Sequence, residues 1–304
     1  MSPRLLTSLS KRPVAGVSLA NVSVLRLDLT GGPAPGNKHF KLRASLDAAR
    51  RQGIRRLVSF GGPWSNHLHA LAAVGQVQGL ETIGLVRGEE AEGDSAMLAD
   101  ARRWGMRIVR VDRSEFRRRN EPAYLREVAS RFGPCLVIPE GGSGAQGVRG
   151  CRGIADLLQR VAPQARRILL PVGTGTTLAG LVAGLDSSCE VVGVSALKGA
   201  ADLEQRVATA LAGCAEVAPR ARAHWRILHD AHCGGFARVN ESLKDFILEF
   251  EKVQGVPLEP VYTGKMLLAI HRRLRSGEWP ADQPLLAIHT GGLQGRRGYD
   301  WLAA

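Results

Sequence analysis

Two short segments hold the residues whose types and spacing best suit chemistry. In the first, Gly36-Asn37-Lys38-His39-Phe40-Lys41-Leu42, a lysine stands beside a glycine turn at the expected start of a helix. In the second, Gly61-Gly62-Pro63-Trp64-Ser65-Asn66-His67, two glycines lead into hydroxyl, amide and imidazole groups at another helix start. The field of a helix N-terminus disfavours a lysine cation and helps to free its amine for attack. The two segments therefore predict a lysine that forms a Schiff base with an aldehyde cofactor.

A third segment suits a phosphate. Gly173-Thr174-Gly175-Thr176-Thr177 follows an apolar run, so that backbone N–H groups, hydroxyls and a helix N-terminus converge there. It lacks the Gly-Lys-Ser/Thr ending of a P-loop, and it lacks the Gly-x-Gly-x-x-Gly pattern of dinucleotide sites. Many structural turns have the same composition, but as a ligand site this loop fits one phosphate better than a nucleotide.

The elements around these segments alternate in the manner of an α/β fold. Strands are expected at Arg56–Phe60, Glu81–Val86, Arg107–Val111, Cys135–Ile138, Arg167–Pro171, Glu190–Ser195 and Leu285–Thr290. Helices are expected at Lys38–Gln52, Asn66–Gln78, Ser95–Trp104, Ala123–Phe132, Gly147–Val161, Thr177–Gly184 and Leu243–Gln254. Strands joined by helices pair in parallel, and such sheets bind ligands at the carboxyl ends of their strands. The glycine loops at 61–62, 173–175 and 291–292 are thus expected to assemble one site.

Composition excludes several other classes of protein. The 304 residues, 44% of them hydrophobic, suit a globular protein of one or two domains. No apolar run is long enough to cross a bilayer, and the N-terminal residues lack a secretory pattern, so we expect a cytoplasmic protein. The five cysteines are scattered without a Cys-x-x-Cys pair, which argues against a disulfide framework and against a metal site.

The net charge of +13 raises the question of nucleic-acid binding. Only seven of the 41 basic residues are lysines, and the arginines are spread along the chain rather than gathered in one segment. Few aromatic residues are interspersed among the basic ones, and the sequence contains no known nucleic-acid-binding motif. An anionic substrate or biased codon usage explains the charge as well, so no nucleic-acid partner is expected.

Several motifs, in order, resemble those of the 1-aminocyclopropane-1-carboxylate deaminase/D-cysteine desulfhydrase family. These are fold-type-II, tryptophan-synthase-β-like enzymes that use pyridoxal 5′-phosphate. The resemblance runs through most of the chain, over Leu25–Leu29, Gly36–Leu42, Gly61–His67, Pro139–Ser143, Gly173–Thr177, Pro260–Lys265 and His289–Gly292. It implies two open, twisted, mostly parallel sheets flanked by helices.

The resemblance also implies which residues bind the cofactor. Lys38 would hold it covalently and later move the Cα proton, and Lys41 would reach the phosphate, unless Lys41 is simply a surface charge. Asn66 would bind the ring hydroxyl oxygen, and the loop Gly173, Thr174, Gly175, Thr176 and Thr177 would bind the phosphate. Thr290 would face the pyridine nitrogen, where a neutral hydroxyl favours loss of a β-substituent over a long-lived carbanion. The alternative for Thr290 is a strand-end hydroxyl bonded to backbone.

Other positions of the motifs would contact the substrate. Ser65 and His67 would line the carboxylate pocket, and Tyr262 would lie against the substrate with a catalytic role for itself and Ser65. Ser65 or Asn66 could instead only cap a helix, and His67 could be a hydrogen-bonded core histidine. Thr263 stands where ring-opening deaminases carry glutamate and desulfhydrase-like members carry threonine.

The implied reaction is β-elimination from a small amino acid, D-cysteine desulfhydrase-like, with release of a 2-oxo acid and ammonia. Phe236 replaces a second tyrosine usual in the family, and a phenyl ring cannot transfer a proton. The alternatives are 1-aminocyclopropane-1-carboxylate deamination, racemisation, β-replacement, or cofactor binding with little turnover. Substrate identity and chirality stay open.

The motif order also predicts how the chain divides. Residues 1–42 and 166–304 would form a larger, cofactor-binding domain, and residues 43–165 a smaller α/β domain that closes over the site. The family implies a homodimer.

Overall fold

The apolar, β-branched runs form two open sheets in the computed structural model, which describes residues 5–89, 93–214 and 222–302. In this described part, the larger sheet has six strands in the order β1-β2-β10-β7-β8-β9. Its neighbours are parallel except for the pair β1 and β2. Its strands are β1 (Leu6–Ser8), β2 (Val22–Arg26), β7 (Arg167–Val172), β8 (Glu190–Ser195), β9 (His224–Leu228) and β10 (Leu285–His289).

The smaller sheet comes from one continuous stretch of the chain. Its four strands, in the order β5-β4-β3-β6, are all parallel over the described residues. They are β3 (Arg56–Gly61), β4 (Glu81–Arg87), β5 (Arg107–Val111) and β6 (Leu136–Ile138). The central strands β3 and β4 are buried along most of their length, as expected for parallel strands covered on both faces.

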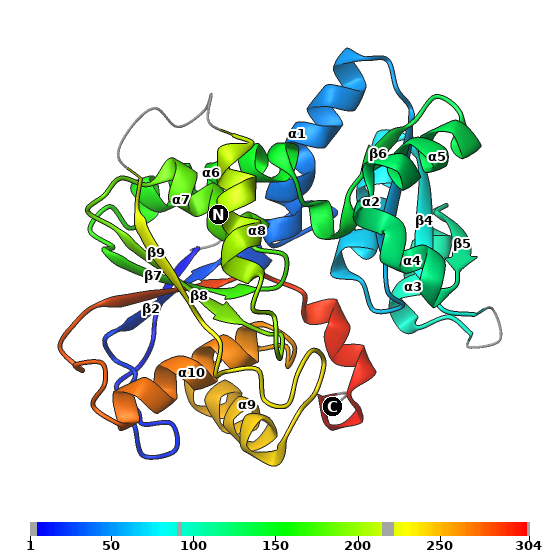
Figure 1. Ribbon diagram of the computed structural model, residues 1–304. Coiled ribbons are helices and arrows are strands. Elements are labelled where there is room, and N and C mark those ends of the chain that lie inside the picture. Colours follow the sequence, from blue (N-terminus) through cyan, green and yellow to red (C-terminus); the bar gives the residue numbers. More distant parts are fainter. Residues whose placement is uncertain (1–4, 90–92, 215–221, 303–304) are drawn as a thin grey trace.

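Helices cover both faces of each sheet (Figure 1). On the larger sheet, one face packs against α9 (Glu241–Gln254) and α10 (Thr263–Arg275), and the other against α6 (Ala145–Val161), α7 (Thr176–Gly184) and α8 (Leu203–Ala212). The smaller sheet carries α2 (Asn66–Gln78), α3 (Ala96–Arg103), α4 (Arg113–Arg117) and α5 (Pro122–Phe132). The helix α1 (Asn37–Arg51) stands between the two sheets (Figure 1).

Short 3-10 turns complete the chain. They are η1 (Leu27–Leu29), η3 (Arg118–Asn120), η4 (Glu140–Gly142), η6 (Leu293–Gly298) and η7 (Asp300–Leu302). No helix within the described residues is both long and apolar enough to span a bilayer.

The predicted fold class is confirmed: this is an α/β protein with two open, mostly parallel sheets flanked by helices. Every predicted strand and helix is present, with shifts of a few residues at the ends. Six elements were not predicted: β1, β2, α4, α8, β9 and α10. The edge strands β1 and β9 are short and only partly buried, which weakens their pattern, and a proline and glycine around Tyr262 concealed the start of α10. The domain boundaries near residues 43 and 166 stay a prediction.

Candidate active site

The first turn of α1 is tied to the end of β10. Gly36, just before the helix, has a φ of 100°, and a Cβ at this position would lie 2.4 Å from the carbonyl oxygen of Thr290. The same oxygen accepts a hydrogen bond from the backbone N–H of Asn37 at 3.0 Å. Only glycine fits this approach, so the contact fixes where the following residue, Lys38, projects.

Lys38 is half-buried beside other polar groups. Its Nζ donates a hydrogen bond to Asn37 Oδ1 at 3.2 Å. Desolvation by the surrounding protein, together with the positive charge of Lys41, lowers the pKa of Lys38 to about 7. A substantial share of the Lys38 amine is therefore uncharged at neutral pH, and an uncharged amine is what a nucleophile requires.

Lys41 and the loop after β7 form a polar cup. Lys41 is 4% exposed, and its Nζ donates to the carbonyl oxygen of Gly141 at 3.1 Å and to Thr174 Oγ1 at 3.3 Å. Thr174 Oγ1 lies 3.0 Å from Thr176 Oγ1, at the first residue of α7. Two hydroxyls, a cation and a helix N-terminus thus face one another, an arrangement suited to an anion such as phosphate.

The cup is joined to the start of α1. The buried amide of Asn37 donates from Nδ2 to Thr177 Oγ1 at 3.1 Å. Tyr262 packs against the first residue of the loop 173–177. A Cβ at Gly173 would lie 3.2 Å from the Tyr262 hydroxyl oxygen. The structure therefore brings Lys38, Lys41 and the loop 173–177 together, as expected from parallel strands whose carboxyl ends meet at one edge.

The start of α2 shows which residue caps the helix. Ser65 Oγ accepts from the backbone N–H of Leu68 at 3.2 Å, so Ser65 is the cap. Asn66 Oδ1 instead accepts from Gln294 Nε2 at 2.8 Å. The side chain of Asn66 therefore does not cap α2, and its Nδ2 takes no part in the contact with Gln294.

His67 lies deeper and carries no charge near neutral pH. It is 2% exposed, and its Nε2 lies 2.9 Å from Ser59 Oγ. Burial, followed by the charges of Lys38 and Lys41, lowers the pKa of His67 well below its ordinary value. His67 is thus a hydrogen-bonded imidazole close to both lysines; its contact with substrate stays a prediction.

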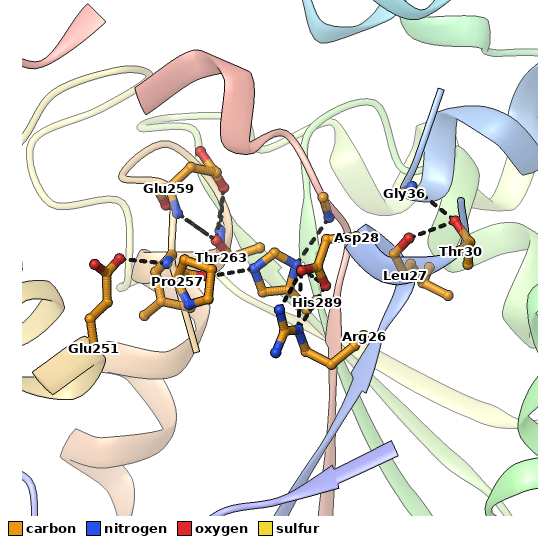
Figure 2. A network of polar contacts seen from close by, with 12 residues as sticks. Arg26, Leu27, Asp28, Thr30, Gly36, Glu251, Pro257, Glu259, Thr263 and His289 are labelled. Atoms are coloured by element: carbon orange, nitrogen blue, oxygen red, sulfur yellow. Dashed lines mark hydrogen bonds and ion pairs between the residues drawn. The ribbon is translucent and has the colours of Figure 1, made fainter. Parts of the chain in front are cut away.

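A buried carboxylate holds the start of α10. Glu259, 2% exposed, accepts from the backbone N–H groups of Val261 at 2.8 Å, Tyr262 at 2.9 Å and Thr263 at 2.6 Å. The hydroxyl of Thr263 is fully buried and bonds the same carboxylate at 3.1 Å (Figure 2). Glu259 therefore orients Tyr262, whereas the predicted contact between Thr263 and substrate stays a prediction.

Tyr262 has an aromatic neighbour at the surface. The ring of Phe236 lies edge-on to that of Tyr262, with centroids 6.0 Å apart, and Phe236 is 55% exposed. Burial and the charge of Glu259 raise the pKa of Tyr262, so its phenol stays protonated.

The end of β10 rests on a second buried network (Figure 2). Asp28 Oδ1 accepts from Arg26 Nε at 2.8 Å and lies 3.1 Å from His289 Nδ1, while His289 Nε2 lies 2.8 Å from the Pro257 carbonyl oxygen. Burial acts to raise the pKa of Asp28, but the hydrogen bonds from Arg26 and His289 outweigh it and lower that pKa to about 2. This network holds Thr290, the next residue, at the same edge as the glycine loops.

Sequence reasoning assigned no role to Ser59, Glu259 or Gln294. Glu259 carried a usable signal, since an acidic residue just before a helix often caps it. Ser59 and Gln294 carry no local signal, because each contacts a residue brought near only by the fold.

Comparison with known proteins relates the chain to enzymes. The model of the family described as pyridoxal-phosphate dependent enzyme matches residues 15–291. A Thermotoga maritima protein provisionally named 1-aminocyclopropane-1-carboxylate deaminase is 30% identical, over 90% of this chain and 89% of that protein. The D-cysteine desulfhydrase of Salmonella choleraesuis is 28% identical, over 89% of this chain and 86% of that protein. A solved structure of an ACC deaminase homologue superposes with a TM-score of 0.78 at 26% identity, covering 95% of this chain and 89% of the other.

Proposed function

This chain belongs to the family of pyridoxal-phosphate dependent enzymes, and we propose that it removes a β-substituent from a small amino acid, releasing a 2-oxo acid and ammonia. Its cofactor is pyridoxal 5′-phosphate, its fold is that of the fold-type-II members, and its reaction class is elimination or deamination. Within that class we favour D-cysteine desulfhydrase-like chemistry.

The residues present fit this cofactor. Lys38 offers an amine whose pKa of about 7 suits attack on an aldehyde. Lys41, Thr174 and Thr176 at the start of α7 offer a cation, hydroxyls and a helix N-terminus for one phosphate. This convergence of Lys38 with the cup is the single observation that carries the proposal.

When bound, the cofactor would supply an electron sink for negative charge at the substrate Cα. Lys38 Nζ is the group we assign to hold the aldehyde and to take the Cα proton. Asn66 would donate from Nδ2 to the ring oxygen, and Thr290 would present a neutral partner to the ring nitrogen. Ser65, His67 and Tyr262 would position the substrate. The β-substituent leaves as hydrosulfide in the case of cysteine, and water hydrolyses the released enamine to the 2-oxo acid and ammonia.

Phe236 favours elimination over opening of a cyclopropane ring. Tyr262 supplies a phenol here, and its neighbour Phe236 offers a ring without a transferable proton. Deamination of 1-aminocyclopropane-1-carboxylate is the second candidate, because the Thermotoga relative and the solved homologue carry that name. We further propose a cytoplasmic homodimer.

The test combines spectroscopy with a substrate panel. Purified protein given pyridoxal phosphate should show the visible band of the bound cofactor, and Lys38→Ala should lose it. Release of 2-oxo acid is then measured from D-cysteine, L-cysteine, D-serine and 1-aminocyclopropane-1-carboxylate. We expect a cysteine to be the best substrate, with sulfide formed in equal amount.

Each contrary result selects another function. A protein that stays colourless would remove the cofactor assignment for this chain. Faster turnover of the cyclopropane amino acid would select the second candidate. Loss of optical activity without 2-oxo acid would select a racemase, and a band without turnover would select a binding protein.

A further inference from the structure

Gln294 joins the larger sheet to the start of α2. It lies in η6, which begins shortly after the end of β10, and its Nε2 donates to Asn66 Oδ1 across 228 residues of sequence at 2.8 Å. Gly292 (φ 86°) lies on the other side of the same amide, because a Cβ there would come 3.0 Å from Asn66 Nδ2. The acceptor end of Asn66 thus meets Gln294, and its donor end faces the carboxyl end of β10.

An amide side chain has one acceptor end and one donor end, so fixing one fixes the other. We propose that Gln294 is a positioning residue: it holds Asn66 Oδ1 so that Nδ2 presents its N–H groups to the ring oxygen of the cofactor. A ring oxygen that becomes a phenolate can only accept a hydrogen bond. If the Asn66 amide were turned the other way, its Oδ1, also an acceptor, would face that oxygen and the two would repel each other. This inference rests on the proposed function, because it takes Asn66 as a cofactor contact.

The turn that carries Gln294 is itself anchored on both sides. Arg296 forms an ion pair with Glu251 of α9, with Nη2 and Oε2 3.1 Å apart. Arg297 pairs with Asp100 of α3, which also contacts Arg103 and, at 3.0 Å, His69 Nε2. Because η6 is held by α9 of the larger sheet and by α3 of the smaller one, Gln294 meets Asn66 in one fixed orientation. Rigid support of this kind is what a residue that orients another requires.

Gln294→Glu tests the polarity of the contact while keeping its shape. A carboxylate only accepts, so Asn66 must turn its Nδ2 toward residue 294 and its Oδ1 toward the ring oxygen. Gln294→Met removes the contact without imposing an orientation. Gln283→Glu is the matched control, since Gln283 is exposed and lies just before β10, at the opposite end of that strand.

The readouts are the Kd for pyridoxal phosphate and the pH dependence of the visible band of the bound cofactor. We expect Gln294→Glu to raise the Kd about tenfold, because a charge-assisted hydrogen bond to the cofactor is lost. Gln294→Met should raise the Kd about threefold. The visible band of Gln294→Glu should appear only at higher pH than in the native protein. Without a hydrogen-bond donor the phenolate is less stable, so the pKa of the ring hydroxyl is higher. Gln283→Glu should leave both measurements unchanged.

The results separate this inference from the proposed function. Native protein that binds the cofactor, with both Gln294 variants matching it, overturns the inference alone. Equal losses in the Glu and Met variants also overturn it, because polarity would then not matter. Failure of the native protein to bind the cofactor removes both. Thermal unfolding of the cofactor-free proteins shows whether each variant is folded. Should Gln294→Glu unfold, an unchanged Kd in Gln294→Met overturns the inference.

Discussion

His67 donates its Nε2 proton to Ser59 Oγ, 2.9 Å away in the centre of the smaller sheet. The direction follows from the next contact, since Ser59 Oγ gives its own proton to the carbonyl oxygen of Ile138 at 2.7 Å. Nδ1 of His67 therefore carries no proton, and no described residue donates a hydrogen bond to it. The neutral imidazole of His67, with its acceptor Nδ1 lacking a donor among the described residues, thus lies close to Lys38 and Lys41.

The first prediction concerns the protonation of His67. Its pKa is lowered by burial and by the two lysines, so we expect it to stay neutral at pH 6.5, where a free histidine is about half protonated. Nitrogen-15 NMR of the cofactor-free protein should report the Nε2–H tautomer, and Ser59→Ala should disturb it. Ser195→Ala, a buried strand serine of the other sheet, is the control. An imidazolium signal at pH 6.5 would contradict the contact network.

The lowered pKa of His67 also makes the free energy of unfolding depend on pH. As pH falls through 6.5, the unfolded chain takes up a proton at His67 before the folded chain does. His67 therefore lowers the free energy of unfolding below pH 6.5 and has no such effect above it.

The second prediction concerns Lys38, whose pKa of about 7 lies far below the ordinary lysine value. Below that pH, the rate at which cofactor-free protein combines with pyridoxal phosphate should rise about tenfold per unit, and it should level off above. Lys41→Met removes a positive neighbour, so it should raise the pKa of Lys38 and move the plateau to higher pH. Lys244→Met, on α9, should leave the profile in place. A plateau reached only near pH 10 would show that Lys38 is not desolvated.

Part of this site could be predicted because it follows local rules. Lys38 and Lys41 share one helical turn, and the loop 173–177 lies between a strand and a helix, so parallel topology alone brings them together. Gln294 could not be predicted as a partner of Asn66, because a contact across 228 residues depends on how the two sheets are placed. Glu259 was missed for a different reason, since the helix that its carboxylate caps was itself not recognised.

The third prediction tests the close approach at Gly36. A methyl group there would collide with the backbone oxygen of Thr290, which cannot move without displacing β10. Gly31 also has a positive φ, of 72°, but an added Cβ would meet nothing within 4 Å. We expect Gly31→Ala to cost about 1 kcal/mol of unfolding free energy, and Gly36→Ala at least about 2 kcal/mol more. Urea denaturation measures both, and equal costs would show that the α1–β10 junction is loose.

The last prediction asks whether Phe236 limits the reaction. Phe236→Tyr would place a second phenol beside Tyr262, whose ring centroid lies 6.0 Å away, in a loop held by Lys265 through the Gly235 carbonyl oxygen at 2.7 Å. Proton transfer by a positioned side chain contributes about a hundredfold or more, so release of 2-oxo acid from 1-aminocyclopropane-1-carboxylate should rise by at least that factor. Release from D-cysteine should change little, because β-elimination has no need of a second phenol.

Phe236→Leu is the matched control, since it keeps an apolar side chain and adds no proton donor. It should leave the ratio of the two activities near that of the native protein. If Phe236→Tyr behaves like Phe236→Leu, the missing phenol does not limit ring opening. The preference between the two substrates must then arise at another position, for which Thr263, buried against Glu259, is the next to be varied.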